Sequence, residues 1–249
     1  MTQPYVKTLK ANGIATITFF HPSHNSMPST VLSDLENAIN NSGQDADVKV
    51  IVLQSGGERT FCAGASFDEL KGIENNVEGK EFFMGFARVI LAMRSCPKII
   101  IGRIQGKAVG GGVGLAAATD YCYATKYASI KLSELTIGIG PFVIAPAVER
   151  KMGLNALSDL TLNATEFYSP EWAKEKGLYA ALFETSILMD EAVQALAVKL
   201  ASYNPEAVAA MKKALWEGTD HWPSLLEERA EMSGTLVLSK FTKETLGAL

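Results

Sequence analysis

Short apolar segments alternate with amphipathic ones along the first half of the chain. The short segments are rich in β-branched and aromatic residues and end at turn residues, which predicts strands over residues 13–20, 48–55, 98–104 and 120–125. Between them, apolar residues recur at helical spacing in a helix capped by Ser29, and in a phenylalanine-rich helix that ends before Pro97. Strands and helices in this alternation predict an α/β fold built of βαβ units.

The pattern changes after Pro141, where the periodicity becomes mostly helical. It predicts one further strand at 179–184 and helices around 142–162, 170–177, 188–203, 205–217 and 222–238. The last two helices carry many large apolar residues, including Trp216 and Trp222. Either a partner subunit or the chain's own core could cover them.

Composition and charge narrow the class of protein. The chain has 249 residues, of which 47% are hydrophobic, and a net charge of −4 with no basic run, so we expect no nucleic-acid partner. Its apolar runs are too short to cross a bilayer and its first residues show no secretion signal, so we expect no membrane association. Three widely spaced cysteines fit neither a disulfide framework nor a metal site, which favours a cytoplasmic location.

A glycine-rich stretch, GKAVGGGVGL at 106–115, is the most unusual feature of the sequence. Its spacing fits neither the G-x-G-x-x-G fingerprint nor the P-loop, so it predicts a turn that opens a helix and presents backbone N–H groups. Tight helix packing is the alternative explanation for the glycines. A second loop of small residues, 58–67, follows the strand at 48–55, as the stretch 105–114 follows the strand at 98–104. Two such loops could each direct one N–H at a single oxygen and form an oxyanion hole.

The chain resembles the crotonase, or enoyl-CoA hydratase/isomerase, superfamily over nearly its whole length. The resembling segments are HNSMPSTVLSDLENAI, TFCAGASF, KIIIGRIQGKAVGGGVGLAAATDYCYAT, ASIKLSELTIGIGP and ATEFYSPEWAKEKGLYAALFE, in that order. The resemblance implies an α/β fold with a crotonase-like ββα spiral core and a helical C-terminal trimerisation region. It divides the chain into an acyl-CoA-binding core, 1–190, and an oligomerisation region, 191–249. The implied partners are an acyl-CoA thioester and further copies of the chain, as a homotrimer or a dimer of trimers.

The resemblance also assigns roles to individual residues. The backbone N–H groups of Ala65 and Gly111 become the oxyanion hole, with Gly110 allowing the close approach. Ala63 and Gly64 would approach the adenine through backbone atoms. We expect Arg59 and Lys71 to contact the coenzyme A phosphates, and Lys240 or Lys243 could do so from a neighbouring subunit. No metal and no cofactor are expected, because coenzyme A is part of the substrate.

Hydratases of this family carry two glutamates near the oxyanion hole, and this chain keeps one of the two positions. The first position holds Gly114, and the second holds Glu134. Because hydration is easiest with two carboxylates, the resemblance favours a one-base reaction, the shift of a double bond from C3 to C2 of an enoyl-CoA. Hydration, decarboxylation of a branched acyl-CoA, and acyl-CoA binding without catalysis remain open.

The neighbours of the predicted base are apolar, and so are several residues expected around the substrate. Burial against such side chains would raise the pKa of Glu134, and the residues expected to do so are Leu132, Leu135, Ile137 and Ile139. The phenylalanines of the second helix, Phe82, Phe83 and Phe86, either wall the acyl chain or belong to the ordinary core. Cys62, beside the first oxyanion loop, is expected to be a buried, unreactive thiol.

Overall fold

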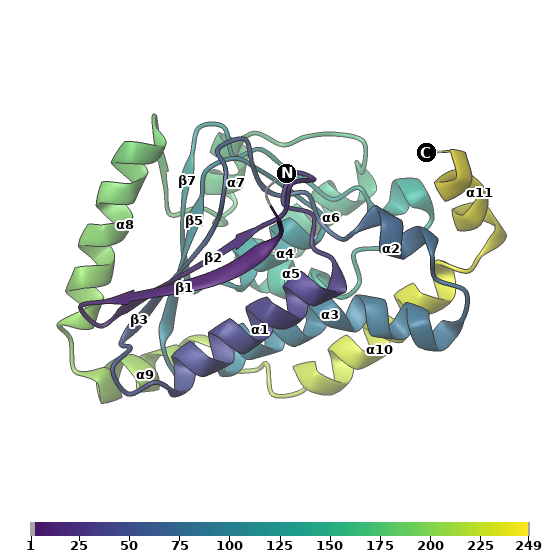
Figure 1. Cartoon of the computed structure of the whole chain (residues 1–249). Helices are drawn as coiled ribbons and strands as arrows, with labels where there is room; N and C mark the ends of the chain where they lie inside the picture. Colours follow the sequence, from purple (N-terminus) through teal and green to yellow (C-terminus); the bar gives the residue numbers. More distant parts are fainter. Residues whose placement is uncertain (1–2, 249) are drawn as a thin grey trace.

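Two β-sheets and a surrounding set of helices make up residues 3–248, the part of the chain that the computed structural model describes (Figure 1). The larger sheet has the strand order β1-β2-β3-β5-β7-β9, with bounds β1 Tyr5–Ala11, β2 Ile14–Phe20, β3 Val50–Ser55, β5 Ile99–Ile104, β7 Tyr121–Thr125 and β9 Ala181–Phe183. Strands β1 and β2 form an antiparallel hairpin across Asn12-Gly13, where φ is 53° and 76°. All other neighbours in this sheet are parallel. The α/β class expected from the sequence is therefore confirmed.

Both faces of the larger sheet are covered by helices. Successive side chains of a strand point to opposite sides, so each central strand contributes to two apolar layers. On one side Ile51 and Leu53 belong to the main core, which includes residues of helices α1 (Ser29–Gln44) and α3 (Asn76–Ser95). On the other side Val50 and Val52 pack with residues of helix α8 (Ser186–Ala201). Figure 1 shows α8 and the α1–α3 pair on opposite sides of the sheet. This double coverage explains the continuous apolar runs of the central strands.

The second sheet is small, parallel and directly connected to the glycine-rich loops. It consists of β4 (Thr60–Cys62), β6 (Lys107–Val109) and β8 (Ile130–Lys131), in that order. The expectation that both loops leave the long strands at 48–55 and 98–104 is therefore wrong, since β4 and β6 intervene. Strands of two or three residues are too short to show a period of two.

The remaining helices of the core include two short ones, α2 and η1, that the sequence pattern did not predict, and one predicted helix that is divided. Their bounds are α2 Phe67–Lys71, α4 Gly111–Ala118, α5 Ala145–Met152, α6 Leu154–Leu162 and α7 Pro170–Glu175, together with the 3₁₀ helix η1 at Glu134–Ile137. The single helix predicted over 142–162 is thus two helices. They meet at Gly153, whose φ of 84° no ordinary helical residue adopts.

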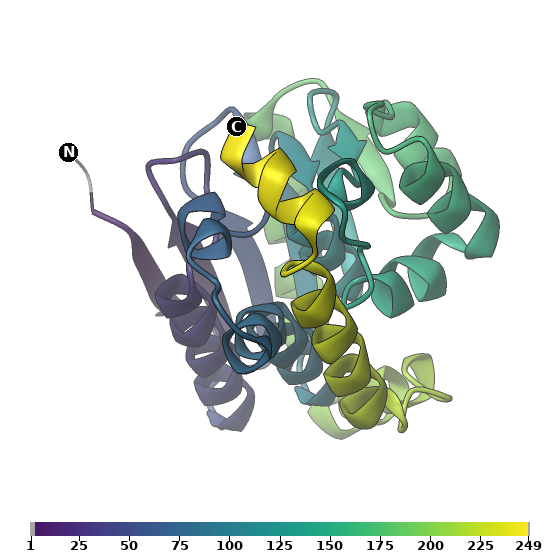
Figure 2. The ribbon, with the colours of Figure 1, turned by 90° about the vertical axis from the view of Figure 1, so that its right-hand side faces the viewer.

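The C-terminal helices fold back over the chain's own core (Figure 2). They are α9 (Pro205–Leu215), α10 (Trp222–Leu236) and α11 (Lys240–Ala248). Helix α10 crosses α3 so closely that a Cβ at Gly79 would lie 2.6 Å from the carbonyl oxygen of Gly234. Trp216 and Trp222 are each only 4% exposed, so the chain itself covers them. A trimerisation role for residues 191–249 stays a prediction, and residues 1–2 and 249, at the ends of the two predicted regions, lie outside the described residues.

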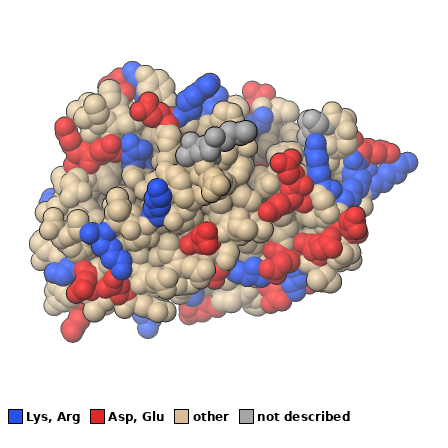
Figure 3. Space-filling model, viewed as in Figure 1, with Lys and Arg blue, Asp and Glu red and all other residues tan. Residues whose placement is uncertain are grey.

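Acidic and basic side chains are interspersed on the face shown in Figure 3. Within residues 3–248, no helix has the length and apolar character needed to cross a lipid bilayer.

Candidate active site

Three loops converge at one edge of the small sheet, because its three strands are parallel and their carboxyl ends meet there. Strand β4 leads into Ala63–Ala65, β6 leads into Gly110 and helix α4, and β8 leads within two residues to Ser133 and Glu134. Residues from all three loops line one cavity, here called the central pocket. The sequence therefore predicted the right loops, although it missed the sheet that brings them together.

The first two loops touch through backbone atoms. Gly64 has a φ of +92°, and a Cβ there would lie 3.1 Å from the carbonyl oxygen of Val109 and 3.7 Å from the amide nitrogen of Gly111. Only glycine allows this conformation and this approach at once. The amide N–H groups of Ala65 and Gly111 donate no hydrogen bond to any residue between 3 and 248. Both flank the same pocket, so they are free to donate to one ligand oxygen.

Helix α4 begins at this point. Gly110 precedes it with φ 53° and ψ −121°, and its carbonyl accepts the amide N–H of Val113 at 2.9 Å. The positive end of the helix dipole then lies beside the Gly111 amide, where it favours negative charge on a bound oxygen. The helix interior is packed as closely as its glycines allow, since a Cβ at Gly112 would lie 2.6 Å from the Cys62 carbonyl oxygen. The glycine run thus serves both the loop geometry and the helix packing.

Glu134 supplies the ionisable side chain of the central pocket. A Cβ at Gly110 would lie 2.9 Å from its Oε1 atom, which puts the carboxylate against the start of the second loop. Its Oε2 atom is buried and has no hydrogen-bond partner among the described residues. A buried acceptor without a partner is rare in a folded protein and marks Glu134 as a group held ready for a ligand.

The surroundings of Glu134 explain its ionisation. The walls of the pocket are mostly apolar and include Leu70, Phe82, Phe83, Phe86, Ile139 and Phe142. Burial among them raises the pKa of the Glu134 carboxyl from 4.5 to about 7, although its own backbone N–H acts in the opposite direction. Ile137 and Ile139 line the pocket as expected. Leu135 is 42% exposed and does not line it, so the expectation that Leu135 also shields Glu134 is wrong.

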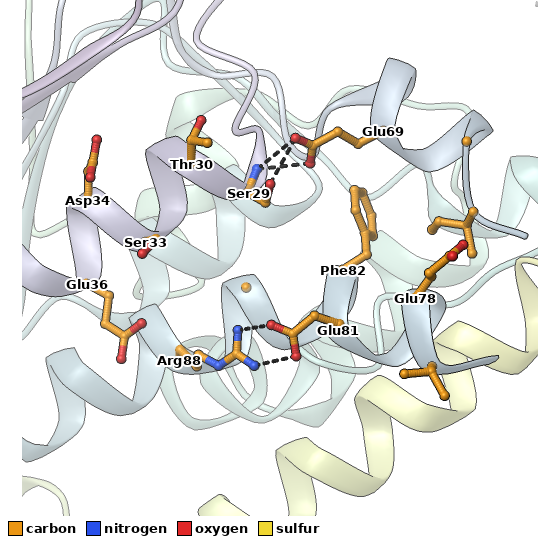
Figure 4. Close-up of a pocket in the computed structure, with 14 residues that line it drawn as sticks. Ser29, Thr30, Ser33, Asp34, Glu36, Glu69, Glu78, Glu81, Phe82 and Arg88 are labelled. Carbon is orange, nitrogen blue, oxygen red and sulfur yellow. Dashed lines mark hydrogen bonds and ion pairs between the residues drawn. The ribbon is translucent and has the colours of Figure 1, made fainter. Parts of the chain in front are cut away.

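The loop that carries Ala65 is held by hydrogen bonds from the N-terminal segment. Met27 N donates to the Gly64 carbonyl at 2.8 Å, and the Asn25 side chain donates to the carbonyls of Gly56 and Thr60 at 2.8 Å each. Beyond the loop, the Glu69 carboxylate accepts the backbone N–H of Ser29 at 2.9 Å and its hydroxyl at 3.0 Å (Figure 4). These bonds fix the loop to the start of helix α1.

The C-terminal helix supports the segment that carries Glu134. Gly138, with φ +83°, follows η1, and a Cβ there would lie 2.5 Å from both the Phe241 ring and the Thr242 hydroxyl oxygen. On its other side, helix α11 is tied to the end of α2 by a hydrogen bond from Lys243 Nζ to the carbonyl oxygen of Ile73. Helix α11 therefore spans the elements that hold Ala65 and Glu134.

The structure places the predicted site residues in two groups. Ala63, Gly64, Ala65, Gly110, Gly111 and Glu134 all line the central pocket, as do Phe82, Phe83 and Phe86. Arg59 and Lys71 do not line it and are exposed, so their contact with phosphates stays a prediction. Cys62 is fully buried as expected, and desolvation raises the pKa of its thiol to about 12.

Several lining residues were not expected from the sequence. Ser133, Phe142 and Ile144 lie in or near the Glu134 segment, and Ser233 comes from helix α10, one hundred residues later in the sequence. A lone serine in an amphipathic helix gives no sign that it faces a pocket. Ile144 has a particular position, because a Cβ at Gly114 would lie 2.4 Å from its Cγ2 atom. Its side chain fills the space beside Gly114.

Comparison with known proteins agrees with this geometry. The family model described as enoyl-CoA hydratase/isomerase matches residues 9–245. A probable enoyl-CoA hydratase of Bacillus subtilis is 28% identical over 94% of this chain and 91% of its own length. A Delta(3,5)-Delta(2,4)-dienoyl-CoA isomerase of Arabidopsis thaliana, named as peroxisomal, is 30% identical over 78% of this chain and 74% of its own. The crystal structure of an enoyl-CoA hydratase from Bacillus halodurans superposes with a TM-score of 0.91 at 24% identity, covering 98% of this chain and all of that one.

The fold, and the two amides that share a pocket with the half-buried Glu134, define an α/β protein of the crotonase class. The chain belongs to the enoyl-CoA hydratase/isomerase family, a family of enzymes.

Proposed function

We propose that the protein isomerises a 3-enoyl-CoA to the 2-enoyl-CoA, with Glu134 as its single base. The thioester carbonyl oxygen accepts hydrogen bonds from the amides of Ala65 and Gly111. Glu134 removes a proton from C2, the electron pair delocalises into a dienolate, and the same carboxyl group returns the proton at C4. The double bond moves into conjugation with the thioester, and no other reactant is consumed.

The observation that carries the proposal is that Glu134 is the only acidic or basic side chain lining the central pocket among residues 3–248. One group must therefore both accept and donate the proton. A carboxyl with a pKa of about 7 suits this task, because it is a stronger base than an ordinary glutamate and is still ionised in half the molecules near neutral pH.

The environment of Gly114 further supports a one-base reaction. This position carries no side chain, and Ile144, which is 4% exposed, occupies the adjoining space. A second carboxylate beside Glu134 would have to displace Ile144. The lack of space for a second carboxylate supports transfer of a proton within the substrate.

Coenzyme A would be held at the mouth of the pocket. Ala63 and Gly64 line the pocket, and a nucleotide is proposed to approach their backbone atoms. The exposed cations Arg59 and Lys71 are proposed for the phosphates, and a homotrimer or a dimer of trimers is proposed as the assembly.

Hydration of an enoyl-CoA is the second candidate, and one feature favours it. The half-buried Ser133 lines the pocket directly before Glu134, where its hydroxyl could help to orient a water molecule. The name of the Bacillus subtilis relative also points to hydration.

A paired assay separates the two reactions. Purified protein is mixed with 3-hexenoyl-CoA in one cuvette and with crotonyl-CoA in another, and the ultraviolet absorbance of the conjugated thioester is followed. We expect absorbance to rise with 3-hexenoyl-CoA and to stay nearly constant with crotonyl-CoA. A fast fall with crotonyl-CoA and no rise with 3-hexenoyl-CoA would instead establish hydration.

A further inference from the structure

A second cavity lies on the outer side of helix α3, between α1, α2 and α3 (Figure 4). This outer groove has Ile73, Val77 and Gly85 among its lining residues, with charged side chains such as Glu69, Glu81 and Arg88 around them. Five carboxylates and one cation line the groove, so its charges are only partly paired. Arg88 forms a two-pronged ion pair with Glu81 at 2.6 Å, and Glu69 binds Ser29.

Phe82 lines the outer groove and also lines the central pocket. Its ring packs edge-to-face on Phe83, with 5.1 Å between the ring centroids. Phe83 and Phe86 line only the central pocket and not the outer groove. In Figure 4 the Phe82 side chain points from α3 toward the segment that carries Glu69. One aromatic side chain therefore belongs to the wall between the two cavities.

The position of Phe82 along α3 sets a distance from the oxyanion hole. Phe86 lies beside the Gly111 amide, since a Cβ at Gly111 would fall 2.3 Å from its ring. Phe82 is four residues earlier on the same helix, which corresponds to a rise of about 6 Å. An acyl chain that starts at the oxyanion hole and follows α3 reaches Phe82 after only a few methylene groups.

We propose that Phe82 closes the central pocket toward the outer groove and restricts the enzyme to acyl chains of short to medium length. This inference rests on the proposed function, because it takes the central pocket as the acyl-binding site. Removing the ring would join the two cavities, and a longer hydrocarbon chain could then lie on Ile73 and Val77. Each further buried methylene strengthens binding about fourfold, so the preference for chain length depends strongly on this one side chain.

Binding of saturated acyl-CoAs tests the inference without relying on turnover. Dissociation constants for hexanoyl-CoA and dodecanoyl-CoA are measured by calorimetry with the full-length protein, for the wild type, Phe82→Ala and Phe83→Ala. Phe83→Ala is the matched control, because it removes an equal ring from the same helix and enlarges only the central pocket. We expect Phe82→Ala to raise the preference for dodecanoyl-CoA over hexanoyl-CoA at least 30-fold, roughly two to three buried methylenes. For Phe83→Ala we expect a change of less than about threefold, because the ring deletion leaves the wall between the cavities in place.

Two further variants keep the test decisive. Phe82→Leu is a milder change that covers the case in which Phe82→Ala does not fold, and it should shift the preference in the same direction. Val77→Asp, at a 79% exposed position of the groove, should cancel most of the gain when combined with Phe82→Ala. An unchanged preference in folded Phe82→Ala and Phe82→Leu overturns this inference alone. Failure of the wild type to bind either acyl-CoA overturns the proposed function as well.

Discussion

The carboxylate of Glu134 lies against Gly110, at a distance that leaves no room for a side chain on that glycine. A Cβ at position 110 would lie 2.9 Å from Oε1, and the residue has a φ of +53°. The glutamate comes from the segment after β8, and the glycine precedes the helix whose first amide points into the pocket. The base and one oxyanion donor are therefore adjacent because glycine permits it.

The raised pKa of Glu134 predicts the pH dependence of turnover. A base must be ionised to accept a proton, and the pKa of this carboxyl is about 7. The kcat/KM for 3-hexenoyl-CoA should rise about tenfold per pH unit below pH 7 and level off above it. A profile measured from pH 5 to 9 checks this. A plateau that already begins near pH 5 would show that the carboxyl is not desolvated in the working enzyme.

The same pKa predicts that Glu134 lowers stability at neutral and alkaline pH. The folded state binds the proton more tightly than the unfolded state, whose carboxyl has a pKa near 4.5. Proton binding at Glu134 therefore stabilises the folded state in full below pH 4.5. This contribution to the free energy of unfolding is lost as the pH rises through about 7, by up to about 3 kcal/mol. Glu134→Gln removes this dependence. We therefore expect urea unfolding to show the variant gaining stability over the wild type between pH 5 and pH 8.5; a constant difference would contradict the prediction.

Substitution of Gly110 should damage both stability and catalysis. Gly110→Ala imposes a backbone cost of about 1–3 kcal/mol, because φ 53° with ψ −121° lies in a region that residues with a Cβ rarely adopt. It also pushes the Glu134 carboxylate from its place, and a misplacement near 1 Å can cost about 100-fold in rate. Gly218→Ala is the control, because Gly218 has a φ of +78° and no atom within 4 Å of a Cβ. Similar melting temperatures of the two variants, together with a much lower kcat in Gly110→Ala than in Gly218→Ala, would support the account. Equal activity in the two variants would show that the contact with Glu134 has no catalytic importance.

The pair Gly114 and Ile144 should control whether water can be added. In Gly114→Glu alone the new side chain has no space, since even its Cβ would lie 2.4 Å from the Ile144 side chain. With Ile144→Ala, a second carboxylate could enter beside Glu134 and hold a water molecule. We expect the double variant to hydrate crotonyl-CoA about tenfold faster than the wild type or more, while Ile144→Ala alone gives no such gain. The assay is the loss of absorbance of crotonyl-CoA. No gain in a folded double variant would mean that the steric barrier does not exclude hydration.

Local chemistry made part of this site predictable from the sequence. The two loops of small residues could be recognised because glycine has a distinctive conformational role, and Glu134 could be singled out by its place in a resembling motif. The sheet β4-β6-β8 could not be predicted from the sequence, since strands of two or three residues carry no periodic signal. Nor could the closeness of Ser233 or Phe241 to the site, because such contacts depend on how α10 and α11 cross the earlier helices. The break at Gly153 was hidden by apolar periodicity that continues through both helices.

The most direct test of the account is turnover and ligand binding in Glu134→Gln, measured side by side. The variant keeps the shape of the side chain and removes its basicity. If Glu134 is the single base, kcat for 3-hexenoyl-CoA should fall by about 10³-fold to 10⁴-fold, and the dissociation constant of hexanoyl-CoA should change less than about threefold. A decarboxylase would keep part of its turnover on a branched acyl-CoA, and a binding protein would show no turnover to lose. Retention of wild-type isomerisation by a folded Glu134→Gln variant would contradict the central claim.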